Sequence, residues 1–187
     1  MKKVLLTSFV GMLAVSAASA MTLAPYAAIR GGYNMTNVSN EHEDLDGNGF
    51  VLGAGLGLEL YSDTMFGIRA EVEYNYVTAD VDSADAKNST VLANFFADIK
   101  TDTIITPYVG LGIGYGWTTI DDGEKIDDSN MAWQLGAGIT YRAMENFMLD
   151  LGYRYLNSTT FTIESPAGNV DSDISSHQIY LGARLAF

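Results

Sequence analysis

The chain has 187 residues, no cysteine and a formal net charge of −13, with 23 acidic and 10 basic side chains. This length fits one domain, and the lack of cysteine excludes disulfide cross-links. The acidity argues against binding to nucleic acid or to anionic membrane surfaces.

The first twenty residues have the composition of a secretory signal peptide. Lys2 and Lys3 precede an apolar run over 4–15, and a small-residue cleavage site follows at Ala18-Ser19-Ala20. The run has about a dozen residues, fewer than the ~20 that a membrane-spanning helix needs. We therefore predict cleavage of 1–20, export, and a single mature domain over 21–187; losing two lysines changes its charge from −13 to −15.

The mature chain repeats segments of about a dozen residues in which apolar and polar side chains alternate, as they do in strands. The predicted strands are 25–36, 50–61, 65–77, 89–100, 107–118, 131–142, 147–157 and 176–187. They exceed the five or six residues usual in soluble proteins and match the roughly 9–11 tilted residues that cross a bilayer.

The two faces of these strands differ in charge. One face is apolar and uncharged, whereas the other carries most of the Lys and Arg together with carboxylates. A soluble β-sandwich or lipocalin-like barrel is the alternative, but it leaves the large aromatics at the ends of the apolar face unexplained. We predict an all-β, eight-stranded antiparallel up-and-down transmembrane β-barrel with a packed polar lumen.

The connections alternate in length, which orients the barrel. Four long loops carry a net charge of −13 and are expected outside the cell, whereas three short connections are expected to be periplasmic turns. The long loops are 37–49, 78–88, 119–130 and 158–175, and the short turns are 61–64, 101–106 and 143–146. Aromatic girdles are predicted at Tyr33, Phe50, Tyr76, Trp117, Trp133 and Tyr155 towards the outside, and at Phe66, Tyr141, Phe147 and Phe187 towards the periplasm.

The stretch 43–50, Glu-Asp-Leu-Asp-Gly-Asn-Gly-Phe, matches the first half of a calcium-binding loop. An EF-hand also needs flanking helices and a glutamate at the twelfth position, which here is Gly55. We expect Asp-Gly and Asn-Gly to form the reversal of the first external hairpin instead. A weak divalent-cation site remains open at Glu41, Glu43, Asp44 and Asp46.

The charged side chains of the lumen must neutralise one another, because an isolated buried charge costs several kcal/mol. The candidates are Arg30, Glu59, Arg69, Glu71, Glu73, Asp98, Lys100, Arg142, Asp150, Arg154 and Arg184. Two networks are expected: Glu59, Arg69, Glu71, Asp98 and Lys100 in one, and Arg142, Asp150 and Arg184 in the other. Hairpin pairing puts Glu59 opposite Arg69, Asp98 close to Arg69, and Asp150 opposite Arg184. Either the interior is simply packed, or it forms a gated ion path that Arg69→Ala would open.

Catalysis is not expected. A lipase needs a serine with a histidine base in reach, and the candidates are His42 in the first loop and His177 beside Ser175 and Ser176. Ser176 points to the opposite face of its strand, and no acid is spaced to orient the histidine. No cofactor-binding motif and no transition-metal cluster is present in the sequence.

The last segment, 178–187, has the sequence QIYLGARLAF, with apolar residues at every second place and a terminal aromatic. With PYVGLGIGYGW at 107–117 and LDLGYRY at 149–155, the mature chain resembles the small bacterial outer-membrane β-barrel family of the OmpA transmembrane domain, OmpX and the opacity-type adhesins. The resemblance implies a surface-exposed barrel in outer-membrane lipid and lipopolysaccharide. It also implies an insertion signal for the barrel-assembly machinery, at Leu181, Ala183, Leu185 and Phe187.

The function predicted is that of an integral outer-membrane protein with a structural or cell-surface interaction role, carried by its acidic external loops. A host or cell-surface ligand at the loops is its expected partner, and the barrel is expected to be a monomer. The alternatives are a narrow porin-like channel and an enzyme that modifies lipid A or phospholipid.

Overall fold

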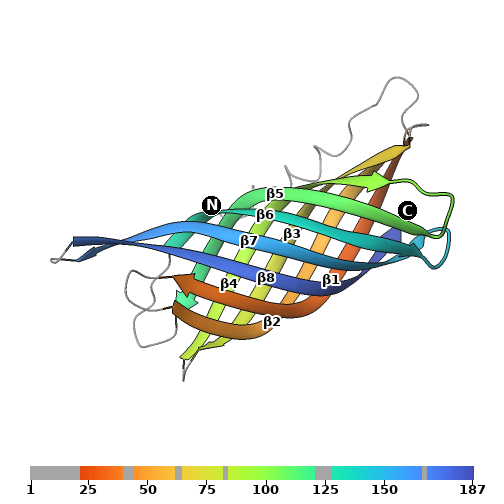
Figure 1. Ribbon diagram of the computed structural model, residues 1–187. Coiled ribbons are helices and arrows are strands. Elements are labelled where there is room, and N and C mark those ends of the chain that lie inside the picture. The colour runs from red at the N-terminus through yellow and green to blue at the C-terminus, as the bar shows by residue number, and fades with distance from the viewer. Residues whose placement is uncertain (1–21, 40–43, 62–64, 82–83, 121–127, 166–167) are drawn as a thin grey trace, which may run out of the picture.

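The computed structural model describes residues 22–39, 44–61, 65–81, 84–120, 128–165 and 168–187. They form a closed barrel in which each strand pairs antiparallel with the next and β1 pairs with β8 (Figure 1). The strands are β1 (Thr22–Ser39), β2 (Asp44–Tyr61), β3 (Phe66–Val81), β4 (Ala84–Ile99), β5 (Ile105–Ile120), β6 (Asp128–Arg142), β7 (Phe147–Ser165) and β8 (Gly168–Ala186). The predicted fold class, with eight strands in up-and-down order, is confirmed.

The strands are longer than predicted at the end with the long connections. β7 continues to Ser165 and β8 begins at Gly168, whereas alternation predicts an end at 157 and a start at 176. These extensions lie beyond the apolar wall, where lipid no longer requires an apolar face. A hydropathy pattern therefore marks the part of each strand that crosses the membrane and misses the rest.

The expected reversal at 43–50 is wrong. β2 begins at Asp44, and Gly47 and Gly49 pair with Thr36 and Asn34 of β1, within the ladder. Both glycines are buried, so they occupy inward positions of a strand rather than a turn. Asp44 and Asp46 belong to the start of β2, whereas Glu41 and Glu43, the other two cation candidates, lie outside the described residues.

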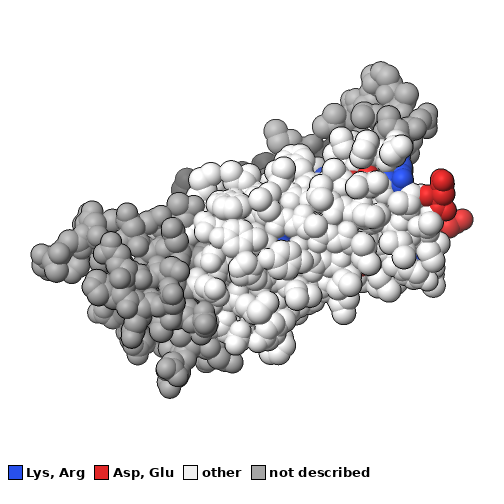
Figure 2. Space-filling model, in the orientation of Figure 1, with Lys and Arg blue, Asp and Glu red and all other residues white. Residues whose placement is uncertain are grey.

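The barrel is apolar outside and charged inside. Leu56 is 63% exposed and Leu181 67%, whereas Arg69 and Glu73 are each 1% exposed. This is the reverse of a soluble barrel and excludes that alternative, because such a wall is stable only in lipid. In Figure 2 the lateral surface is almost free of charge, and the visible Lys, Arg, Asp and Glu gather at the end with the short turns. No helix in the described residues is long and apolar enough to cross a membrane.

Candidate functional site

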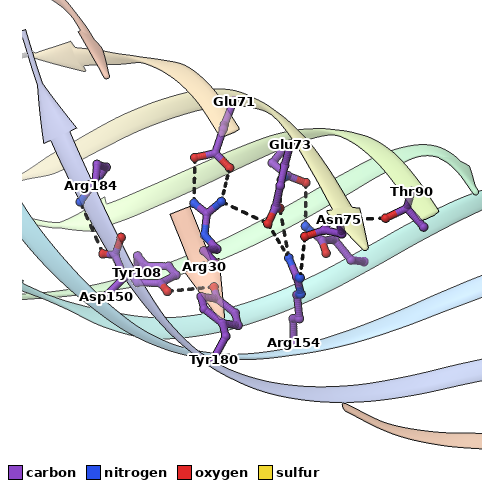
Figure 3. Close-up of polar contacts among 12 residues, drawn as sticks. Arg30, Glu71, Glu73, Asn75, Thr90, Tyr108, Asp150, Arg154, Tyr180 and Arg184 are labelled. Carbon is purple, nitrogen blue, oxygen red and sulfur yellow. Dashed lines mark hydrogen bonds and ion pairs between the residues drawn. The ribbon is translucent and has the colours of Figure 1, made fainter. Parts of the chain in front are cut away.

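Four charged side chains span the middle of the lumen (Figure 3). Arg30 of β1 makes two hydrogen bonds to Glu71 of β3, at 2.6 and 2.8 Å, and its Nη1 lies 3.1 Å from a Glu73 oxygen. Arg154 of β7 reaches Glu73 from the opposite wall at 3.0 Å. We call Arg30, Glu71, Glu73 and Arg154 the central charge layer. Its two positive and two negative charges balance.

Side-chain amides complete this layer around the barrel. Asn94 donates to Glu73 at 2.8 Å, and Gln134 donates to Asn94 at 2.7 Å. Arg154 Nε donates to Gln178 at 2.5 Å, and Gln178 in turn donates to Asn34 at 2.9 Å. All four amides are buried, so these bonds satisfy polar groups that would otherwise be costly.

A second layer lies on the side of the short turns. Arg69 makes two 2.7 Å hydrogen bonds to Asp98, and its guanidinium carbon lies 4.5 Å from the Phe96 ring centroid and 5.0 Å from that of Tyr108. The Tyr108 hydroxyl is 3.0 Å from the hydroxyl of Tyr180. Arginine and aromatic rings together fill the space that the glycine-rich strands leave.

A third cluster lies nearest the short turns. Arg184 donates to Glu59 at 2.7 Å, and its Nη2 is 3.6 Å from Asp150. The Thr140 hydroxyl bridges Asp150 and Arg184: it donates to Asp150 at 2.6 Å and accepts from Arg184 at 3.3 Å.

These contacts change the predicted networks. The predicted closeness of Asp98 to Arg69 is confirmed by their ion pair. Glu59 lies opposite Arg69 in the ladder, as predicted, but it pairs with Arg184. Glu71 of β3 pairs with Arg30 of β1, which is not an adjacent strand. The register identifies neighbours on adjacent strands. In a lumen this narrow, arginine side chains also reach carboxylates on strands that are not adjacent.

Other members of the predicted networks take different positions. Asp150 lies opposite Gly182 rather than Arg184, which pairs in register with Met148. Asp150 and Arg184 nevertheless belong to one network, as predicted, because their side chains form an ion pair. Arg142 is exposed at the end of β6, outside the buried clusters, and Lys100, directly after β4, is half-buried. The sequence does not predict the central layer as a unit. It does place Arg30, Glu73 and Arg154 at inward positions, which is the pattern that indicates the layer.

Two cavities lie in the described part of the lumen. A cavity of about 300 Å³ opens near the short turns, lined by Glu59, Arg69, Asp98, Lys100, Arg142 and Arg184 among others. A second cavity, beside the central layer, measures about 10 Å³, which holds about one water molecule. Beyond it, Leu92, Ala132 and Leu156 pack into a buried apolar cluster.

The histidine and serine candidates separate onto two faces. Ser176 is buried in the lumen, 3.2 Å from the Thr36 hydroxyl. His177 and Ser175 are half-buried at outward positions, and His177 Nδ1 lies 2.6 Å from the Tyr153 hydroxyl. In a catalytic triad a carboxylate holds that nitrogen. Among the described residues, no three His, Cys, Asp or Glu side chains group in a way that could hold a metal ion.

An uncharged, aromatic-ringed wall around a packed polar lumen defines the class: an integral β-barrel of the outer membrane. Residues 5–187 match the outer membrane protein beta-barrel domain family, and the chain belongs to that family. Its location is accordingly the Gram-negative outer membrane, in contact with its lipid and lipopolysaccharide.

Two sequence relatives show how far the similarity extends. The chain is 25% identical over 198 residues to outer membrane protein PagN of Salmonella typhimurium, covering 85% of this chain and 83% of PagN. It is 32% identical over 90 residues to an uncharacterized protein of Brucella abortus, covering 40% of this chain and 32% of that protein.

Solved structures share the fold at low identity. Neisserial surface protein A superposes with a TM-score of 0.61 at 19% identity, covering 86% of this chain and 97% of its own. Ail of Yersinia pestis gives 0.50 at 17%, covering 86% and 99%. The outer membrane enzyme PagL gives 0.53 at 14%, covering 81% and 97%. The fold therefore occurs in surface proteins and in an enzyme, so by itself it does not decide between them.

Proposed function

We propose that the protein is a membrane-anchored surface protein that contacts other molecules through its external hairpins, above all the ribbon formed by the ends of β7 and β8. This proposal rests on how far those two strands continue. β6 pairs with β7 only as far as Ser158, and β1 pairs with β8 only as far as Asp173. The β7–β8 ladder continues to Ser165 and Gly168, and the ribbon extends past the barrel wall (Figure 1).

The ribbon has two strand edges without a paired neighbour in the described strands, over 159–165 and 168–172. Unpaired edges can accept an extended segment of another chain. Between Ser158 and Phe161, β7 advances three residues while β8 advances two. Such a bulge bends and twists a strand, which turns the ribbon relative to the wall below it.

The charge of the hairpins favours a basic partner. The four long connections sum to −13; Glu164 and Asp171 lie on the ribbon, and Asp173 lies at its base. Ail, the attachment invasion locus protein, has been solved with the heparin analogue sucrose octasulfate. A sulfated ligand of that kind would be repelled by these connections. We therefore propose a cationic protein segment on a host or neighbouring cell as the ligand.

Export and membrane insertion depend on segments near the two ends of the sequence. We infer that 1–20 are removed as a signal peptide and that β8 carries the signal for the barrel-assembly machinery, with Leu181, Leu185 and Phe187 exposed. The Phe187 amide donates to the Pro25 carbonyl at 2.9 Å, so the last residue joins the first strand. A monomer suffices for this role, since the barrel closes on itself.

Transport and catalysis have less support. The space of about 10 Å³ beside the central charge layer is too small for a hydrated ion. His177 is held by a tyrosine hydroxyl, where a triad would place a carboxylate. We therefore propose neither a channel nor a lipid-modifying enzyme.

The test is to shorten the ribbon. Deleting 161–172 and joining β7 to β8 through an Asn-Gly turn should leave heat-modifiable gel mobility intact, because the deleted pairs lie above the wall. Adhesion of bacteria producing this variant to host cells should fall tenfold or more. The matched control, Glu164→Gln with Asp171→Asn and Asp173→Asn, keeps the edges and removes the charge, so it should keep part of the adhesion. Wild-type adhesion by the shortened barrel would contradict the proposal.

A further inference from the structure

One imidazole lies on the outward face of the described strands, at the level of the external aromatic girdle. His177 is opposite Tyr155 of β7 and Met35 of β1, on strands that run side by side (Figure 1). Its neighbours in the chain, Ser176 and Gln178, are buried in the lumen, so His177 faces outward.

Two tyrosine rings fix the orientation of this imidazole. The His177 ring stacks on Tyr153 with centroids 6.1 Å apart and contacts Tyr155 at 5.2 Å. Its Nδ1 is 2.6 Å from the Tyr153 hydroxyl oxygen. Because the two nitrogens lie on different sides of the ring, Nε2 is directed away from that hydroxyl. When Tyr153 donates to Nδ1, the hydrogen of the neutral ring is on Nε2, and a protonated ring also donates from Nε2. Either form offers a donor to the surroundings.

Further polar groups follow towards the long-loop end of the same face. Ser175 shares the outward face of β8, and its register partners are Asn157 on β7 and Asn37 on β1. Ser175 and Asn157 are half-buried, and Asn37 is exposed. The outward positions with described side chains on β1, β7 and β8 include no carboxylate. Neutral donors gathered on adjacent strands can hydrogen-bond to an anionic acceptor.

The membrane supplies an acceptor at this depth. Trp133 and Tyr155, whose rings are 5.6 Å apart, belong to the girdle that sits at the level of lipid headgroups. Below it, Ile179 and Leu181 are exposed on the apolar wall. A phosphorylated lipid with its acyl chains on this wall would bring phosphate oxygens to the donors above.

We propose that His177, Tyr153, Ser175 and Asn157 form a binding site for the phosphate of an outer-leaflet lipid. Nε2 of His177 donates to a phosphate oxygen, Ser175 and Asn157 contribute neutral donors, and Tyr153 sets the orientation of the imidazole. The site is separate from the ribbon and independent of any ligand that the hairpins bind.

A binding experiment in phosphate-free detergent tests the proposal. The mature chain has two histidines, His42 and His177, so histidine-selective ¹⁵N labelling gives signals from only two imidazole rings in dodecyl maltoside micelles. Lipid A should shift the His177 signal saturably. Dephosphorylated lipid A with the same acyl chains, and inorganic phosphate at the same concentration, should not. An equal shift with the dephosphorylated lipid would show that His177 responds to the acyl chains and not to phosphate. An equal shift with inorganic phosphate would show that the site binds free anions. Either result overturns the proposal.

Variants separate the donor from the packing. His177→Phe keeps an aromatic ring and removes both nitrogens, so lipid A retained in native mass spectra should bind about tenfold more weakly, the effect of one hydrogen bond to a charged group. Tyr153→Phe should weaken binding less, since only the orienting hydroxyl is lost. Tyr115→Phe removes a hydroxyl from an exposed ring on β5 and should change nothing. With heat-modifiable mobility intact, wild-type affinity in His177→Phe would refute the assignment.

Discussion

Replacing Glu73 with Gln removes one negative charge from the centre of the barrel and keeps the shape of the side chain. Glu73 is 1% exposed and lies 3.1 Å from Arg30 and 3.0 Å from Arg154. The central charge layer would then hold two positive charges and one negative. Removing one partner of a buried ion pair costs about 3–5 kcal/mol. Glutamine still accepts one hydrogen bond, so we expect a loss of about 3 kcal/mol in the free energy of unfolding.

Reversible urea unfolding in lipid vesicles measures this loss, with the fluorescence of Trp117 and Trp133 as the signal. Glu145→Gln is the matched control, because it makes the same charge change at an exposed position and should cost less than about 0.5 kcal/mol. Equal stability of the two variants would refute the layer as a structural element.

A double-mutant cycle tests whether charge balance is the cause. Combining Glu73→Gln with Arg154→Met leaves Arg30 and Glu71 as a balanced pair, which keeps its hydrogen bonds of 2.6 and 2.8 Å. The double variant should therefore be about 2 kcal/mol more stable than the sum of the single changes predicts, within the range for directly coupled residues. Simple additivity would mean that the lost stability comes from packing.

Three further predictions concern the lumen. Tyr108→Phe leaves the buried Tyr180 hydroxyl without its 3.0 Å partner and should cost about 1–3 kcal/mol in urea unfolding; a neutral result would contradict that pairing. Gly114→Ala would put a methyl group against a backbone carbonyl oxygen of β4, whereas at Gly116 the nearest atom is a side-chain methyl at 3.2 Å. The first should therefore cost about 2 kcal/mol more than the second, and equal costs would contradict the close approach. Arg69→Ala should stay closed in planar-bilayer recordings, because the central charge layer still spans the lumen; unitary openings would show that Arg69 alone seals it.

The sequence predicts the membrane-crossing part of each strand and which residues face the lumen. This is possible because alternation with period two is a local pattern, and because lipid requires every outward residue to be uncharged. It places Arg69 and Glu73 in the lumen, where both are buried. It does not predict where the hairpins end. The segment from Asp44 to Gly49 belongs to β2 although its composition is that of a turn, since backbone hydrogen bonds continue above the lipid without an apolar face.

The sequence predicts the ion pairs of Arg69 with Asp98 and of Arg184 with Asp150, but it misses the partners of Glu59 and Glu71. Register relates each residue to its neighbours on the wall, and it correctly puts Glu59 opposite Arg69. The partner of Glu59 is nevertheless Arg184 of β8. Which carboxylate an arginine reaches depends on the direction of the long side chain and on competing partners, and both are set only when the barrel closes.

The same closure bears on how the β7–β8 ribbon could act. A two-stranded ribbon is marginally stable in water, and a third strand is what usually makes such a sheet persist. The barrel fixes the register of the ribbon at its base, through the pairs that β7 and β8 make with β6 and β1 as far as Ser158 and Asp173. Above that point neither edge pairs with a third strand among the described strands, so a partner segment that pairs there would add the contact that stabilises the ribbon. Binding would then stabilise the ribbon selectively, and the barrel below, which is already closed, would keep its stability.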